Sequence, residues 1–185
     1  LVDKHGRRLR KLRISLTEAC NLRCVYCMPE HATFAHRDEL LAPTEIVDIV
    51  SDLAELGIEA VRITGGEPTL RAEFPEIARR ICEIPALKVG LTTNGWRLSE
   101  HATSLAKWGM HGVNVSLDSL DADNFRRMAR GGDLGQVLSG IRAARDAGLV
   151  VKINTVVMRG LNDHELEAFH DFALLEGVEV RFLEL

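Results

Sequence analysis

Cys20, Cys24 and Cys27 lie within eight residues of one another, at C-x3-C-x2-C spacing. Three soft thiolates at this spacing can hold a metal ion or an iron–sulfur cluster from one short loop. A four-iron cluster bound by only three cysteines keeps one iron free of protein ligands. Such an open iron can bind and activate another molecule, as an open position does on catalytic zinc.

Two other interpretations of the three cysteines stay open at this point. A zinc site needs a fourth ligand, which His31 or His36 could supply. A disulfide with one free thiol is less favoured, because the sequence has few cysteines and three of its four are grouped together. That distribution is typical of metal chemistry in a reducing cytoplasm. We expect the fourth, Cys82, to be a small buried hydrophobic residue.

The composition limits the class of protein. The chain has 185 residues, enough for one domain over 1–185, with 46% apolar and 27% charged residues. A net charge of −4 argues against a nucleic-acid partner. The longest apolar runs, such as 148–151, are far too short to span a membrane. The basic N-terminus has no apolar segment after it, so we expect no secretory signal.

Short strand patterns alternate with longer helical patterns along the whole chain. We expect strands near 11–16, 59–64, 87–92, 112–117, 150–155 and 178–184. We expect helices near 43–57, 72–82, 98–108, 121–128, 134–147 and 162–175. This alternation predicts an α/β fold with parallel strands, either a six-stranded partial barrel or an open doubly wound sheet. The sequence ends on a strand pattern with no helix after it, so we expect this chain to be part of a longer protein.

Several residues mark the ends of the predicted helices. Pro43 or Thr44 is expected to open the first helix, Ser99 the third, and 162–163 the last. Glycines stand just past four helix ends, where a left-handed conformation is favoured: Gly57, Gly109, Gly148 and Gly177.

Polar residues follow the predicted strands at their carboxyl ends. The cysteine segment follows the first strand, and Gly65-Gly66-Glu67-Pro68 follows the second. The remaining strands end near these groups: Thr92-Thr93-Asn94-Gly95, Ser116 and Asp118, Asn154, and Glu184. In parallel α/β folds these strand ends share one face, and active sites form there. We therefore expect the active site on this face.

Four strands carry a cation between apolar neighbours: Arg13, Arg62, Lys152 and Arg181. Side chains alternate faces along a strand, so these cations should point away from the helices into the lumen. Four cations in one cavity repel one another and lose hydration unless an anion joins them. The pattern predicts a polyanionic small-molecule ligand. The alternative is that some of these cations pair with Glu67, Asp118 or Glu184.

The cysteine motif and the Gly-Gly-Glu-Pro turn one βα unit later together resemble the radical S-adenosylmethionine (SAM) superfamily. The resemblance implies a partial TIM barrel of (βα)6 type, here truncated after the sixth strand. It also implies a 4Fe–4S cluster whose open iron chelates SAM, and a 5′-deoxyadenosyl radical formed from it by one electron from an external donor. In such chemistry the protein supplies placement and exclusion of water.

Longer segments are similar to the family of GTP 3′,8-cyclases: 12–29, 61–71, 113–121, 151–160 and 181–185. This resemblance implies a lyase that catalyses the first step of molybdenum cofactor biosynthesis. The radical would take hydrogen from C3′ of GTP, and the ribose radical would attack C8 of guanine. The alternative is another radical SAM enzyme acting on a peptide or a different nucleotide. A zinc-stabilised binding domain and an electron-transfer protein are weaker readings, the latter because ferredoxin-type clusters use four cysteines.

The resemblance assigns roles by position. Cys20, Cys24 and Cys27 would ligate the cluster, and no further catalytic residue is assigned. Tyr26, Gly66 and Ser116 would contact SAM. The GTP side would comprise Arg13, Arg62, Thr93 and Lys152, with Arg181 supporting one of the anionic ligands. The chain departs from the family at Glu18-Ala19, where Asp-Arg is usual, and it lacks the second-cluster cysteines and the C-terminal diglycine. A homodimer is also expected.

Overall fold

The computed structural model describes residues 1–184, apart from the side chain of Arg37; Leu185, the end of the last family-like segment, lies outside the described residues. Six parallel strands form one sheet in sequential order. They are β1 (Lys11–Ser15), β2 (Ala60–Thr64), β3 (Lys88–Thr93), β4 (Gly112–Ser116), β5 (Val150–Val157) and β6 (Glu179–Glu184). Every predicted strand is confirmed to within one residue at its start and two at its end.

Six α-helices connect and cover these strands: α1 (Pro43–Glu55), α2 (Phe74–Cys82), α3 (Leu98–Lys107), α4 (Ala122–Ala129), α5 (Leu134–Asp146) and α6 (Leu166–Glu176). Three short 3-10 helices, η1 (Arg37–Glu39), η2 (Pro68–Leu70) and η3 (Asp163–Glu165), lie in the connections. A doubly wound sheet reverses its strand order at a switch point, whereas this order is sequential throughout. The fold is therefore the partial (βα)6 barrel, and the doubly wound alternative is wrong.

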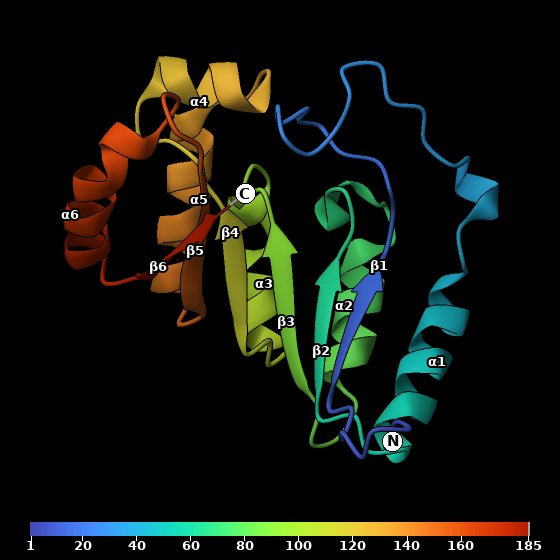
Figure 1. Cartoon of the computed structure of the whole chain (residues 1–185). Helices are drawn as coiled ribbons and strands as arrows, with labels where there is room; N and C mark the ends of the chain where they lie inside the picture. Colours follow the sequence, from blue (N-terminus) through green and yellow to red (C-terminus); the bar gives the residue numbers. More distant parts are fainter. Residues whose placement is uncertain (185) are drawn as a thin grey trace.

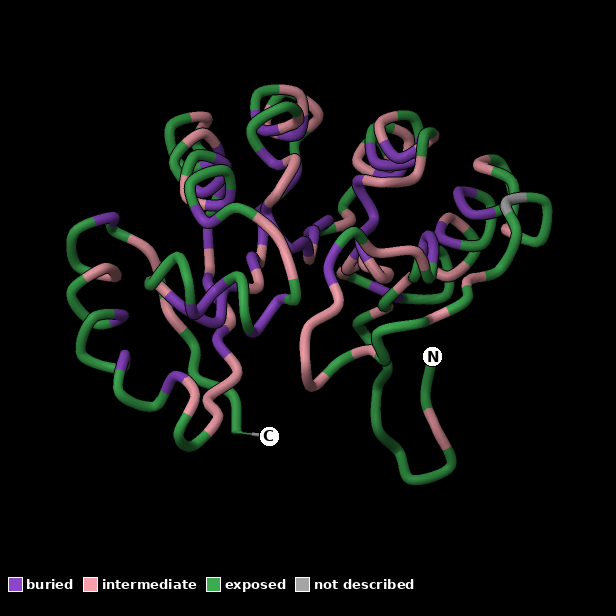
Figure 2. The backbone as a smooth tube through the Cα atoms, turned by 90° about the horizontal axis from the view of Figure 1, so that it is seen from above, coloured by how far each residue is buried: buried purple, intermediate pink, exposed green. Residues whose placement is uncertain are grey.

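The strands curve inside an arc of helices (Figure 1). Figure 2, seen from above, shows the helices in an arc along one side of the strands, with buried residues where helices and strands face each other. Within residues 1–184 no helix is both long and apolar enough to cross a bilayer.

Alternation along the strands divides the two faces of the sheet. Val61 and Ile63 of β2 and Leu91 of β3 are buried beneath the helices. They pack with helix residues such as Ile81 and Leu105, which are fully buried. Each such side chain contributes about 1.5–3 kcal/mol through burial. The residues between them point to the inner face and are available for a ligand.

The helix ends agree only partly with the sequence. Pro43 opens α1 as predicted, and the Glu45 side chain accepts a hydrogen bond from Ala42 N at 2.7 Å. The prediction for Ser99 is wrong by one residue, because α3 begins at Leu98. Asn162 precedes η3 rather than α6 and makes no cap there. The four predicted terminal glycines all have positive φ, between 64° and 99°.

Candidate active site at the carboxyl ends of the strands

The cysteines lie on the long connection between β1 and α1, called here the cysteine loop (residues 16–42). In Figure 1 it lies above the tips of the strand arrows. Its first residues run along the Gly-Gly-Glu-Pro turn, where Gly66 N donates to Thr17 O at 2.7 Å and Glu67 N donates to Ala19 O at 2.8 Å. A Cβ at Gly66 would collide with the backbone of Ala19 and the residue before it. Glycine is therefore required for this close approach.

Glu67 fastens this turn to the end of β3. Its carboxylate is fully buried and accepts four hydrogen bonds. Two come from Thr69, at 3.0 Å from the backbone N and 2.5 Å from the hydroxyl. The other two come from Thr93 Oγ1 at 2.8 Å and Asn94 N at 2.6 Å. These bonds satisfy a buried carboxylate that would otherwise be strongly destabilising.

Asn94 continues the network into the cysteine loop. Its Nδ2 donates to Asn21 Oδ1 at 2.8 Å and lies 3.9 Å from Cys20 Sγ. Trp96 N donates to Asn94 Oδ1 at 3.0 Å and fixes the orientation of the amide. The end of β3 therefore positions the first cysteine.

Tyr26 connects the far side of the loop to β4. Its hydroxyl donates to Asp118 Oδ2 at 2.8 Å, and the other oxygen of Asp118 accepts from Val156 N at 2.8 Å. Burial, followed by the negative charge of Asp118, raises the pKa of the Tyr26 phenol. Burial likewise raises the pKa of Asp118. The phenol is therefore a hydrogen-bond donor here and not an anion.

The end of α4 holds the middle of the loop. Arg23 N donates to Ala129 O at 3.0 Å, and Val25 N donates to Met128 O at 2.9 Å. These two amides flank Cys24, so the last carbonyls of α4 determine where that cysteine lies.

All three loop cysteines are free thiols, with Cys20 and Cys24 half-buried and Cys27 exposed. Burial raises the pKa of Cys20. Burial, and then the charge of Asp118, raises the pKa of Cys24 to about 12. The raised pKa values of Cys20 and Cys24 favour their protonated forms in the free chain, and binding of a metal has to displace those protons.

Cys82 is unlike the loop cysteines. It ends α2, is half-buried against the hydrophobic core, and its pKa is raised to about 11 chiefly by burial. It behaves as the small hydrophobic residue that the sequence predicted.

The three cysteines suit a cluster better than a single ion. Among residues 1–184, no three His, Cys, Asp or Glu side chains are grouped closely enough to hold one metal ion. The zinc interpretation, with His31 or His36, therefore gains no support. In a 4Fe–4S cluster each thiolate binds a different iron, so the ligands lie further apart. Three free thiols on one well-anchored loop fit that donor set.

A cavity of about 490 Å³ lies on the inner face of the sheet. Its cationic lining residues are Lys11, Arg13, Arg62, Lys88, Lys152 and Arg181, and His111 joins them. All four predicted lumen cations are thus brought together. No Asp or Glu lines the cavity within the described part of the chain.

The four cations differ in their partners. Arg62 donates to Leu91 O at 3.0 Å and to the side chain of Asn114 at 3.2 Å. Burial, then the charges of Arg13 and Arg181, lowers the pKa of Arg62. Within residues 1–184 neither Arg13 nor Arg62 has a carboxylate partner. The cavity therefore holds uncompensated positive charge on its β1–β2 side.

The other two cations share an acid that the sequence analysis did not consider. Glu179, at the start of β6, lies 2.6 Å from Lys152 Nζ and 2.5 Å from Arg181 Nε. Some of the cations do pair, as the alternative allowed, but the partners it named were wrong. Glu67 and Asp118 are occupied by the contacts described above. Lys152 of β5 lies directly opposite Glu179 of β6 in the sheet, and this register explains the ion pair between them.

Thr93 lies on the other face of the sheet from the cavity. It is 2% exposed, its hydroxyl donates to Glu67, and the same oxygen accepts from Gly95 N at 3.1 Å. Thr92 is the threonine that lines the cavity. The sequence contains the information needed to place Thr93. Side chains alternate between the two faces of a strand, so Thr93 lies on the same face as the buried Leu91, two residues before it.

The remaining predicted contacts lie at the carboxyl ends of the strands. Gly66 follows β2, Ser116 is the last residue of β4, and Tyr26 reaches the residues after β4 through Asp118. Asn114 and Asn154 also line the cavity. Asn154 is one of the predicted polar strand ends, whereas Asn114 lies in the middle of β4 and was not predicted.

Comparison with known proteins is consistent with this arrangement. The sequence profile of the Radical SAM superfamily matches residues 14–173. The chain is 45% identical over 185 residues to GTP 3′,8-cyclase of Synechocystis sp., covering the whole chain and 57% of that protein. It is 45% identical to GTP 3′,8-cyclase of Marinobacter nauticus, covering 56% of that protein. The chain thus spans little more than half the length of these relatives.

Solved structures show the same fold. Streptococcus suis SuiB bound to S-adenosylmethionine superposes with a TM-score of 0.82 at 18% identity, over 95% of this chain and 40% of that one. Methylornithine synthase (PylB) superposes with a TM-score of 0.73 at 17% identity, over 94% of this chain and 52% of that one.

Proposed function

Because the chain belongs to the radical SAM superfamily, we propose that it forms the radical-generating part of a GTP 3′,8-cyclase. Family membership implies a 4Fe–4S cluster and SAM, and Cys20, Cys24 and Cys27 are the residues that would hold the cluster. The cyclase assignment is supported by 41–45% identity, across the whole chain, to proteins of that name.

The observation that carries the choice of substrate is the cation-lined cavity inside the sheet. In the part of the chain that the structure describes, six Lys or Arg side chains and no carboxylate line this cavity of about 490 Å³. That volume is in the usual range of about 300–1,000 Å³ for small-molecule sites. A nucleoside triphosphate supplies the negative charge that these cations require, and its size suits the cavity. A neutral peptide would leave Arg13 and Arg62 uncompensated.

Each predicted contact has a role in this proposal. Tyr26 belongs to the cysteine loop, and Gly66 and Ser116 lie at the carboxyl ends of β2 and β4. These three residues are proposed to contact SAM. Arg13 and Arg62 are proposed to bind phosphate groups. Further substrate contacts are proposed for Lys152, for Arg181, and for Thr92 in place of Thr93.

When bound, the cluster and SAM supply a radical able to remove hydrogen from an unactivated carbon of the substrate. The chain's own part is placement. Asn94 orients the loop at Cys20, α4 holds the backbone on both sides of Cys24, and Asp118 holds Tyr26. The cavity cations hold the substrate phosphates on the inner face of the sheet and so orient the sugar for the reaction.

Other parts of the proposal concern the whole protein. Since its relatives are nearly twice as long, the complete cyclisation is proposed for the full-length protein, with residues 1–185 as its radical SAM core. A one-electron donor, a homodimer and a cytoplasmic location are proposed with it.

Anaerobic reconstitution with iron and sulfide tests the first step. The protein should take up roughly four iron atoms per three-cysteine site, and its spectrum should change when SAM is added. GTP should compete with pyrophosphate for the cavity. A colourless protein that binds one zinc ion would contradict the cluster assignment.

The full-length protein tests the reaction. It should convert GTP to 3′,8-cyclo-GTP while SAM is cleaved to methionine and 5′-deoxyadenosine. Cleavage of SAM that is stimulated by a peptide and not by GTP would favour the alternative radical SAM enzyme.

A further inference from the structure

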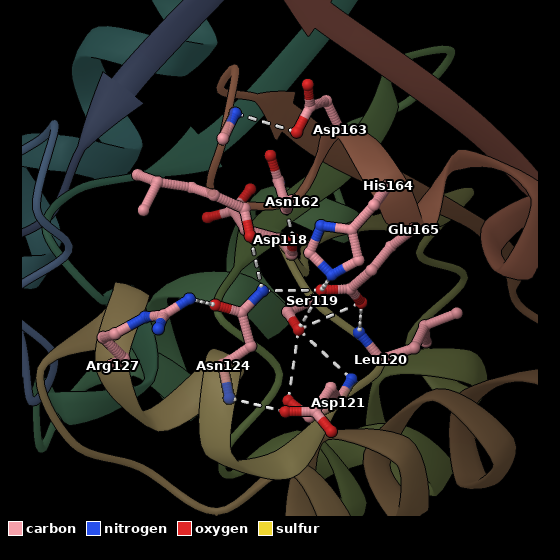
Figure 3. Close-up of polar contacts among 12 residues, drawn as sticks. Asp118, Ser119, Leu120, Asp121, Asn124, Arg127, Asn162, Asp163, His164 and Glu165 are labelled. Atoms are coloured by element: carbon pink, nitrogen blue, oxygen red, sulfur yellow. Dashed lines mark hydrogen bonds and ion pairs between the residues drawn. The ribbon is translucent and has the colours of Figure 1, made fainter.

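Glu165, the last residue of η3, is a buried carboxylate outside the proposed active site. It is 6% exposed. It accepts hydrogen bonds from Ser119 Oγ at 2.7 Å, Leu120 N at 2.7 Å and Asn124 Nδ2 at 2.6 Å (Figure 3). Within residues 1–184, the basic side chain that the structure pairs with it is His164, whose Nε2 lies 4.0 Å from Oε1, and no Lys or Arg forms an ion pair with it. Burying a carboxylate without a close cation is costly, and an apolar side chain would fill the space more cheaply.

The donors around Glu165 belong to two elements that both lead to the cysteine loop. Ser119 and Leu120 lie in the connection after β4, and Asn124 lies in the first turn of α4. Asn124 Nδ2 also donates to Leu161 O at 2.9 Å, so the amide is held between the helix and the segment before η3.

The first connection runs through α4. Asn124 fixes the start of this helix, and the carbonyls of Met128 and Ala129 at its end accept the amides of Val25 and Arg23. A helix of eight residues moves as one unit, so a shift at its first turn is carried to the backbone beside Cys24.

The second connection runs through Asp118, the residue before Ser119. Its carboxylate accepts a hydrogen bond from the Tyr26 hydroxyl. Its backbone carbonyl accepts one from Asn162 Nδ2 at 2.7 Å (Figure 3). Glu165 holds the next residue along. The side chain of Tyr26 is thereby tied to the same buried carboxylate as α4.

We propose that Glu165 is a positioning residue for the cysteine loop. It fixes the position of α4 relative to Asp118. The end of α4 then holds the loop at Arg23 and Val25, and Asp118 holds it at Tyr26. The buried carboxylate contributes more to the relative position of the two elements than to the free energy of unfolding, because its directional hydrogen bonds specify one arrangement of them. This coupling is independent of which substrate the protein uses.

The competing view is that packing alone holds α4. Phe125 and Met128 on its inner face are 4% and 2% exposed. If the packing of these two side chains is enough to hold α4, loss of Glu165 lowers the stability of the whole fold. The amides of the cysteine loop then lose no more protection from exchange than those of other elements.

A matched control is Glu176, which is also 6% exposed. Its carboxylate pairs with Arg142 and Arg145 at 2.8 Å and 2.6 Å and joins α6 to α5. Among the described residues, the hydrogen bonds and ion pairs of this carboxylate go to α5 and none reaches the cysteine loop. Glu165→Gln and Glu176→Gln therefore remove equally buried charges with different connections.

The experiment compares the two variants by amide hydrogen exchange in the chain without metal, alongside denaturant unfolding and iron uptake. With Glu165→Gln, we expect the amides of Arg23 and Val25 to exchange at least tenfold faster relative to those of β2 and β3, and iron uptake to fall. With Glu176→Gln, we expect any loss to be shared by all elements. Equal effects of the two variants on the loop would overturn the proposal.

Asn124→Ala provides a second test if Glu165→Gln does not fold. It removes the hydrogen bonds of Asn124 to Glu165 and to Leu161 O and keeps the connection through Asp118, so Arg23 and Val25 should lose protection while β2 and β3 keep theirs. Unchanged exchange at those two amides would overturn the proposal. None of these readouts depends on GTP, so they separate this inference from the proposed cyclase activity.

Discussion

The guanidinium of Arg62 lies directly over Gly90 of the neighbouring strand. A Cβ placed on Gly90 would come within 2.7 Å of Arg62 Nη1 and 2.8 Å of Cζ. The absence of a side chain at Gly90 therefore lets Arg62 lie flat across β3 and reach Asn114 on β4. Gly90 supplies the space and Arg62 supplies the charge.

Gly90→Ala should displace Arg62 and weaken binding of GTP. The fold should tolerate the change, because the clash is with the mobile end of a side chain and Gly90 is not in the left-handed region. We expect about tenfold weaker binding, equivalent to about 1.4 kcal/mol, with little change in Tm. Equilibrium dialysis and thermal melting measure the two effects.

The double variant shows whether Gly90→Ala acts through Arg62. Adding Gly90→Ala to Arg62→Ala should cause no further loss of GTP affinity. Additive losses would mean that Gly90 has another role.

Glu179→Gln should strengthen anion binding. Glu179 pairs with both Lys152 and Arg181 and offsets one of their two positive charges, so removing its charge frees both cations for the ligand. Because solvent-exposed ion pairs are weak, the gain in affinity should be about a few-fold. Pyrophosphate titration measures it, and Glu184→Gln on the same strand is the control. Weaker binding would show that Glu179 orients the two cations instead.

Glu67→Gln should destabilise the fold strongly. All four groups that reach the Glu67 carboxylate donate hydrogen bonds, and the amide NH2 of glutamine would face at least one of them as a second donor. We expect a loss of about 2–4 kcal/mol in the free energy of unfolding. Denaturant unfolding measures it, with exposed Glu100→Gln as a control that should change stability by less than about 1 kcal/mol.

Replacing any one loop cysteine by serine should abolish stable iron binding. Cys20, Cys24 and Cys27 each supply one of only three thiolates, whereas Cys82 packs against the core. Cys82→Ser should therefore keep its iron after anaerobic reconstitution. Iron and sulfide analysis distinguishes the variants, and retention of the full iron content by Cys27→Ser would contradict the three-cysteine assignment.

His101 should make the fold less stable in mild acid. Its Nε2 is buried without a hydrogen-bond partner in the described structure, and it packs edge-on against Phe74. Burial, with a smaller effect of Arg97 opposed by Glu100, lowers the pKa of His101 below its usual 6.5. In mild acid the unfolded chain therefore binds more protons than the folded chain. The contribution of neutral His101 to the free energy of unfolding is fully present above about pH 6.5 and is lost as the pH falls below that value.

A pH series of denaturant unfolding checks this expectation. His101→Gln should flatten the dependence between pH 5 and 7 relative to the unchanged chain, whatever its effect on stability at pH 8. An unaltered slope would show that other groups cause it.

The fold was predictable because its signals are local. Alternating residues such as Val61 and Ile63 mark both the strand and its buried face. The same alternation identified Arg13 and Arg62 as inner-face cations. The choice of barrel over doubly wound sheet needed the order of the strands, which no local pattern contains.

The errors have physical causes of the same kind. Thr93 was assigned to the substrate side by resemblance, although its phase with Leu91 places it on the buried face. Glu179 was missed because strand pairing sets its partners. Glu165 meets donors more than forty residues away in sequence, at Ser119, Leu120 and Asn124, so only the tertiary structure could reveal it.

The ion pairs of Glu179 with Lys152 and Arg181 make the distribution of charge around the cavity asymmetric. On the β5–β6 side that acid offsets one of the two positive charges of Lys152 and Arg181, whereas within residues 1–184 no carboxylate pairs with Arg13 or Arg62 on the β1–β2 side. An electric field therefore points across the cavity from one wall to the other. A nucleotide, whose charge is concentrated at one end, is turned by that field on arrival, with its phosphates toward β1 and β2 before any hydrogen bond forms.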